Sequence, residues 1–174
     1  LIFCAAVVNS ETKQQLRPVK SSILFQGRLF SILSYEYDKK GNLVKISEEN
    51  KMEESTASAE YKYTADNRCT EIREYSNDKL TSIISLKYDE KGQHVMDTYM
   101  SADRKVLRVK KYEYTDGKLY RKNEFESGDN LTHYIELKYE NNRLSAIVMC
   151  AVGEYTMDVI MVYDDAGYII EEKI

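Results

Sequence analysis

Short stretches in which apolar and polar residues alternate follow one another along the chain, separated by clusters of turn-forming residues. The alternation is clearest in Tyr155–Tyr163, where every odd position is apolar, and it returns in Leu80–Tyr88 and Leu131–Tyr139. Because successive side chains of a strand point to opposite faces, this pattern predicts β-strands. A helical spacing of apolar residues is not sustained anywhere after Pro18.

A tyrosine followed by a turn recurs at nearly constant intervals. The gaps between successive copies are 26, 25, 26, 25 and 24 residues, and the copies are Tyr37, Tyr63, Tyr88, Tyr114, Tyr139 and Tyr163. Such regularity indicates an internal repeat of about 25 residues.

The turns after these tyrosines have two lengths, and each length predicts a hairpin geometry. The shorter turn centres on Asp116-Gly117 or Asn141-Asn142, residues that accept the positive φ angles of a type I′ turn. The longer turn needs a left-handed residue at its fourth position. That position holds Gly41, Asn67, Gly92 or Gly167.

A second series of turns lies between the first ones, so each repeat contains two strands. The sequence therefore predicts an all-β fold, a single antiparallel meander of about twelve hairpin-linked strands in a twisted or curled sheet that is either open or barrel-like. Residues 1–20 are predicted to be an N-terminal extension, and residues 21–174 a single β-repeat domain. Glu48–Ala59 is the only long polar connection, and we interpret it as a loop or solvated turn.

Charge and composition narrow the functional classes. The 174 residues carry 25 Lys and Arg against 29 Asp and Glu, a net charge of -4, which argues against a general nucleic-acid-binding surface. Leu107–Glu113 and Tyr120–Glu124 carry charge on both strand faces. The middle of the sheet is thus predicted to be open to solvent on both sides, or to have a thin core covered by Lys and Arg stems, which also disfavours a sheet embedded in lipid.

The N-terminus and the cysteines leave several possibilities open. The apolar run Leu1–Val8 is either a signal-peptide remnant or a segment packed on the body, and it is too short to span a bilayer as a helix. Cys4 is a possible lipid anchor, although the bulky Phe3 before it speaks against this. Cys4, Cys69 and Cys150 are too few and too widely spaced for a dense disulfide framework, so free, partly buried thiols are expected.

The segment Tyr37-Asp-Lys-Lys-Gly-Asn-Leu43, with its echoes at Tyr88 and Tyr163, resembles the tyrosine-aspartate (YD, or Rhs-type) repeats of bacterial secreted and cell-surface proteins. The resemblance covers about residues 30–174. It implies an extracytoplasmic array of strands and turns, secreted, periplasmic or at the cell surface, and brings no catalytic residue with it. The period is longer than usual for that family, and Thr64, Thr115 and Glu140 replace the aspartate.

Candidate chemistry is sparse, and we assign no catalytic, cofactor or metal site. His94 fills a turn-exit position that Leu occupies elsewhere, which favours a structural role. His133 shares a strand face with apolar residues, which favours a place in the core or at its edge. Acidic pairs such as Asp89-Glu90 could hold calcium. Asp38, Asp89 and Asp164 are better explained as first turn residues that accept backbone N–H groups.

The tyrosines are the most suggestive feature. At equivalent positions of successive hairpins they would form a ladder on one sheet face, and an exposed part of it would suit protein or glycan contacts. The possible binding face comprises Tyr35, Tyr37, Tyr61, Tyr63, Tyr112, Tyr114 and Tyr139.

We therefore expect a non-enzymatic binding or scaffold module for a protein or glycan. The alternatives are a carboxylate-based hydrolase and a carrier of an apolar ligand. The apolar end near Ile170–Ile174 and the opposite edge strand further suggest a homodimer paired through edge strands.

Overall fold

Thirteen β-strands form a single sheet in the computed structural model, which describes residues 17–126, 130–152, 156–163 and 169–173. Each strand pairs antiparallel with its neighbours in sequence, so the predicted all-β meander is confirmed, with one strand more than the expected dozen. The strands are β1 (Lys20–Phe25), β2 (Arg28–Tyr37), β3 (Leu43–Asn50), β4 (Ser55–Tyr63), β5 (Cys69–Ser76), β6 (Lys79–Tyr88), β7 (His94–Ser101), β8 (Val106–Thr115), β9 (Lys118–Glu126), β10 (Asn130–Glu140), β11 (Arg143–Ala151), β12 (Thr156–Tyr163) and β13 (Ile169–Lys173).

The hairpin turns have the predicted geometries. Both central residues of the short turns have positive φ, as at Asp116 (51°) and Gly117 (79°). In the longer turn after β2, the Gly41 N–H donates to the Asp38 carbonyl at 2.9 Å, and Gly41 has a φ of 86°. Asn67 and Gly92 hold the equivalent left-handed position, while Gly167 lies outside the described residues.

Replacing Gly92 by valine is expected to lower the free energy of unfolding by about 1 kcal/mol or more, because a β-branched residue resists positive φ. The atoms nearest to an added Cβ belong to the flexible Arg68 side chain, so the backbone angle dominates the cost. Urea unfolding measures the change. Gly92→Asn is the control and should cost clearly less, since Asn67 already adopts this conformation. Equal losses for both variants would contradict the turn assignment.

The interpretation of Glu48–Ala59 as a long loop is wrong. Its first three residues end β3, its last five begin β4, and only residues 51–54 form the turn. The sheet tolerates this polar strand pair because its side chains meet water instead of a second layer. The polar composition reflects an exposed sheet surface and does not mark a break in the strands.

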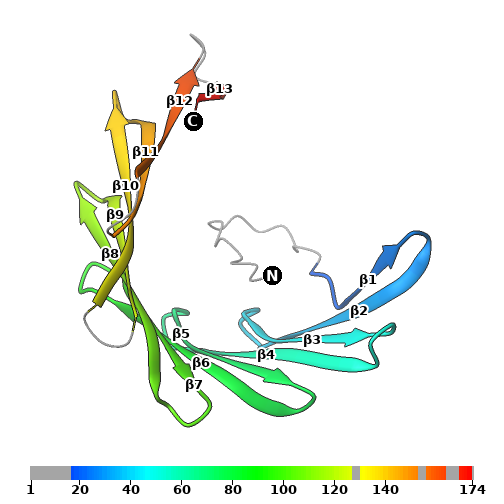
Figure 1. Ribbon diagram of the computed structural model, residues 1–174. Coiled ribbons are helices and arrows are strands. Elements are labelled where there is room, and N and C mark those ends of the chain that lie inside the picture. The colour runs from blue at the N-terminus through cyan, green and yellow to red at the C-terminus, as the bar shows by residue number, and fades with distance from the viewer. Residues whose placement is uncertain (1–16, 127–129, 153–155, 164–168, 174) are drawn as a thin grey trace.

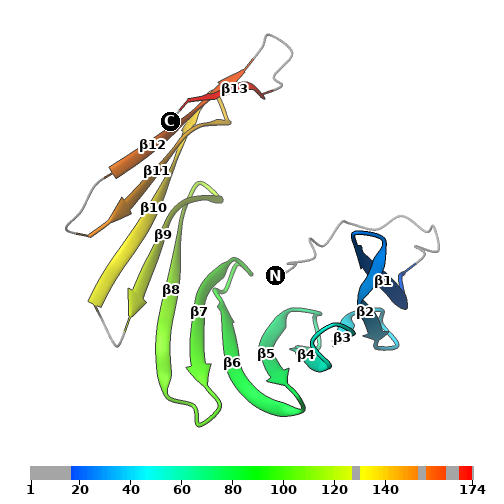
Figure 2. The same ribbon diagram turned by 45° about the vertical axis from the view of Figure 1, so that its right-hand side comes forward.

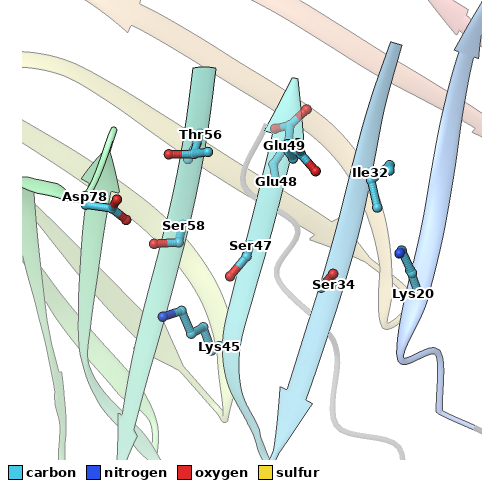
Figure 3. A pocket seen from close by; sticks show the side chains of 11 residues that line it. Lys20, Ile32, Ser34, Lys45, Ser47, Glu48, Glu49, Thr56, Ser58 and Asp78 are labelled. Atoms are coloured by element: carbon cyan, nitrogen blue, oxygen red, sulfur yellow. The ribbon is translucent and has the colours of Figure 1, made fainter. Parts of the chain in front are cut away.

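The sheet follows a wide arc, with β1 and β13 far apart at its two ends (Figures 1 and 2). Each of these two strands has a single neighbour, so the described sheet is open. Residues paired directly across strands share a face, which places Tyr35, Tyr61 and Tyr112 on one side. We call this side the tyrosine face. Figure 3 looks onto the other side of β1–β4 with the opposite arm of the arc behind them, so the tyrosine face is the concave one.

A single layer of this kind buries little. The accessible surface is 13045 Å², whereas a compact globule of this mass exposes about 8,800 Å². Among the described residues only Ile83, Ile84 and Val148 are buried apolar side chains. The molecule therefore offers about half as much surface again as a globular domain.

The sequence predicts that the middle of the sheet is open to solvent on both sides. This is confirmed, because ion pairs lie on both of its faces. Arg108 pairs with Glu124 at 3.2 Å on the tyrosine face, and Arg121 pairs with Glu136 at 3.6 Å on the convex face. Across the ranges that the structure describes, there is no helix with the length and apolar character needed to cross a membrane.

Candidate binding face

Six tyrosine hydroxyls join consecutive repeats by the same hydrogen bond. Each donates to a backbone carbonyl 19 or 20 residues earlier in the chain, as Tyr63 does to Leu43 at 2.9 Å and Tyr114 to His94 at 2.9 Å. Three acceptors are the first residue of a strand (Leu43, Cys69 and His94), and two are the second residue of a strand (Leu119 and Leu144). The sixth acceptor, Pro18, lies just before β1. The donors are Tyr37, Tyr63, Tyr88, Tyr114, Tyr139 and Tyr163.

A basic side chain covers four of these six rings. Arg68 lies 5.8 Å from the centroid of the Tyr88 ring, and Lys118 lies 4.9 Å from that of Tyr139. Arg17 and Arg143 cover Tyr37 and Tyr163 in the same way. In each case the basic residue directly precedes the residue whose carbonyl accepts the tyrosine hydrogen bond, so one short segment holds both the ring and the hydroxyl.

The seven tyrosines of the predicted binding face all lie on the tyrosine face. Six are half-buried, and Tyr139 is 37% exposed. Tyr35 is hydrogen-bonded to Ser21 at 3.1 Å, and Tyr112 donates to Asp97 at 2.7 Å. Burial raises the pKa of Tyr63 to about 12, so its hydroxyl remains a donor at neutral pH. Four tyrosines of this set are thus held by hydrogen bonds to backbone carbonyls, a contact that the sequence pattern does not indicate: Tyr37, Tyr63, Tyr114 and Tyr139.

Removing one of these tyrosine hydroxyls should destabilise the sheet more when the hydrogen bond that it makes is buried than when that bond is exposed. Tyr114→Phe is expected to lower the free energy of unfolding by about 1 kcal/mol, because the His94 carbonyl loses its donor inside the sheet. Tyr139→Phe is the matched control: its hydrogen bond has the same length but lies in solvent, so a smaller loss is expected. Chemical denaturation compares the two, and a larger loss for the exposed Tyr139 would contradict this explanation.

A polar cluster lies at the centre of the tyrosine face. Asp97 is only 6% exposed; its two carboxylate oxygens contact the His94 Nε2 at 2.6 Å and the Tyr112 hydroxyl at 2.7 Å. The His94 ring also lies between the rings of Tyr88 and Tyr112, with centroids 5.3 and 4.8 Å away. Burial disfavours the charged carboxylate, but the two hydrogen bonds and Lys110 outweigh it and hold the pKa of Asp97 below its usual range.

This cluster orients an imidazole with a carboxylate, the arrangement that general bases use. In the described part of the chain, no serine or threonine is hydrogen-bonded to His94. Its contacts instead link β6, β7 and β8, which agrees with the structural role predicted for this histidine. The expectation that His133 lies in the core or at its edge is wrong, because its side chain is exposed. In a single-layer sheet, sharing a face with apolar residues does not imply burial.

Next to this cluster the tyrosine face is strongly charged. The Arg108 guanidinium lies 4.2 Å from the centroid of the Tyr99 ring, and the Lys110 ammonium lies 4.9 Å from it. Glu124 contacts both cations, at 3.2 and 3.8 Å. A shallow hollow lined in part by Ile84, Tyr99 and Arg108 lies beside them.

Further along, over β10–β12, the same face becomes apolar. The register places six half-buried side chains there in two rows: Ile135, Met149 and Met157, and Leu137, Ile147 and Val159. The alternation of apolar and polar residues in the sequence already marks these six positions as one face of each strand. The order of the strands is needed to show that they form one continuous surface.

A second hollow lies on the convex face over β1–β4, with a volume of about 340 Å³. Figure 3 shows Ser34, Ser47 and Ser58 side by side across three strands, with Asp78 and Lys20 at the two ends of this row and Glu49 and Lys45 on either side of it along the strands. Its lining is polar and of mixed charge, and the sequence reasoning did not single it out.

Two of the aspartates assigned to turns bind the backbone there. The Asp38 carboxylate accepts the Asn42 N–H at 2.8 Å, and that of Asp89 accepts the Gln93 N–H at 2.7 Å, as predicted. Asp164 lies outside the described residues. Within the described ranges, no group of three His, Cys, Asp or Glu side chains is arranged to hold a metal ion. Cys69 and Cys150 are half-buried, and Cys4 lies outside the described part.

No protein-family model matches the sequence, and no curated protein matches it either. Among solved structures, the fold is similar to that of a porin-like protein from Bacteroides uniformis, with a TM-score of 0.52 and 12% sequence identity. The match covers 77% of this chain and 53% of the other, so the chain spans about half the length of that protein. At this identity the likeness concerns the fold alone: a sheet of antiparallel strands.

Proposed function

We propose that this chain is a non-enzymatic binding or scaffold module that presents the tyrosine face to a protein or glycan. The observation that carries the proposal is the large accessible surface, 13045 Å² for a 20.3 kDa chain. A stable interface needs about 800 Å² from each partner, which is far less than the excess over a compact globule. Partly exposed tyrosines are suitable contact residues, because a flat ring adds area and the hydroxyl adds a hydrogen bond.

We place the module outside the bacterial cytoplasm, secreted, periplasmic or at the cell surface. The apolar run Leu1–Val8, the resemblance to tyrosine-aspartate repeats and the similarity to a porin-like fold support this location. The unpaired outer edges of β1 and β13 also suit pairing with a second copy, the homodimer expected from the sequence.

The test is a binding screen against glycan and envelope-protein arrays, followed by variants of one tyrosine on each face. Tyr61→Ser on the concave side should weaken the contact about tenfold, the cost of losing one buried aromatic anchor. Tyr75→Ser is the control, because Tyr75 lies on the convex face and donates to Glu60. The proposal fails if the unmodified chain binds nothing on either array, or if both variants bind alike.

A carrier of an apolar ligand is a second candidate. The six apolar side chains over β10–β12 on the concave side favour it, since a carrier requires an apolar surface that curves around its ligand. The two candidates use different parts of the same face. The tyrosines concentrate on β2, β4 and β8, and the apolar rows lie beyond them.

A further inference from the structure

Lys122 lies at the border between the charged and the apolar part of the tyrosine face. Its direct neighbours across the sheet are Tyr112 on β8 and Ile135 on β10. The side chain is half-buried. Over the residues that the structure describes, it has neither a hydrogen bond nor an ion pair, although it lies among charged side chains. A cation in this position can pair with an anion from outside the chain.

The charges around Lys122 make an added anion favourable. Lys110 and Arg108 lie on the same face, and both already share one carboxylate, that of Glu124. The other nearby carboxylate, Asp97, is occupied by His94 and Tyr112. Burial, and after it the positive charge of Lys110, lower the pKa of Lys122, and the carboxylates of Glu124 and Asp97 oppose this only in part.

The strands that follow β9 carry apolar side chains on the same face as Lys122. One row continues through Ile135, Met149 and Met157, and a parallel row contains Leu137, Ile147 and Val159. Strands in a sheet lie about 4.8 Å apart, so the path from β9 to β12 is about 14 Å, the reach of an extended alkyl chain of about a dozen carbons. A ligand with an anionic head and an apolar tail matches this sequence of surfaces.

We propose that the concave face binds a free long-chain carboxylate, with its head group paired to Lys122 and its alkyl chain lying across β10–β12. This assignment gives the carrier candidate a ligand class. It is independent of the macromolecular partner proposed for the tyrosines. A neutral chain would leave Lys122 without a counter-charge. A short carboxylate would leave the apolar rows exposed.

Calorimetric titration with dodecanoate, below the concentration at which it forms micelles, tests the proposal. We expect saturable binding of one molecule per chain, and about tenfold weaker binding for Lys122→Gln. Ile147→Thr, which keeps a β-branched side chain but adds a hydroxyl to the tail path, should also weaken binding. Lys87→Gln is the control, because Lys87 is exposed on the convex face of β6, and it should bind like the unmodified chain.

Two further measurements on the unmodified chain keep the test decisive if a variant fails to fold. Added salt should weaken dodecanoate binding but leave any binding of dodecanol unchanged, because only the former uses an ion pair. Vesicles of phosphatidylglycerol should not bind. The proposal is overturned if dodecanoate does not bind, if Lys122→Gln binds it as tightly as the control, or if the vesicles bind while the free carboxylate does not. These results do not test the binding proposed for the tyrosines, which the Tyr61→Ser and Tyr75→Ser variants test separately.

Discussion

Replacing Asp97 by alanine is expected to lower the free energy of unfolding by about 3 kcal/mol. The carboxylate is 6% exposed and is the common partner of His94 and Tyr112. Its removal leaves an imidazole and a phenol without their shared acceptor and opens a gap between β7 and β8. Urea denaturation followed by circular dichroism measures the loss.

The same carboxylate makes stability depend on acid. Because the pKa of Asp97 is lower in the folded chain than its usual value of about 3.9, its contribution is complete above that pH and declines as the pH falls towards the folded value. Asp97→Asn should therefore flatten the stability curve below about pH 4, relative to the unmodified chain. If Asp97→Ala is nearly neutral, or if the asparagine variant keeps the full acid sensitivity, the cluster has no such role.

Replacing Ile83 by alanine is expected to cost about 3 kcal/mol, although the sheet has a single layer. Ile83 is 2% exposed and lies on the convex face between Arg73 and Met100, its direct neighbours on β5 and β7. Because no second layer covers this part of the sheet in the described ranges, no side chain from another layer can fill the space that the shorter alanine would leave.

Ile160→Ala is the matched control for this prediction, because Ile160 has the same side chain but is 49% exposed. It should cost less than about 1 kcal/mol. Thermal unfolding of both variants gives the comparison. Similar losses at the two positions would show that the burial of Ile83 does not stabilise the fold.

The turns and strand faces could be predicted because they depend on local chemistry. Gly41 and Asp116-Gly117 take backbone angles that few other residues tolerate, and alternation then assigns Tyr35 and Tyr37 to one face. These features are repeated, so each copy supports the interpretation of the others.

The central cluster could not be predicted, because its members meet through register. Asp97 and Tyr112 are 15 residues apart in the chain and come together only when β7 and β8 pair. His133 was misplaced for a related reason, since burial depends on what lies above a face and not on the face alone. The polar β3–β4 pair is a similar case, because exposed strands and loops share a polar composition and composition alone does not distinguish them.

Small-angle X-ray scattering of the dilute chain tests most directly whether the sheet is an open arc that offers its concave side. A compact globule of this length has a radius of gyration of about 16 Å. The structure predicts a clearly larger radius and a flattened, extended distance distribution. A radius near 16 Å would mean that the sheet folds onto itself, and the tyrosine face would then not be available to any ligand.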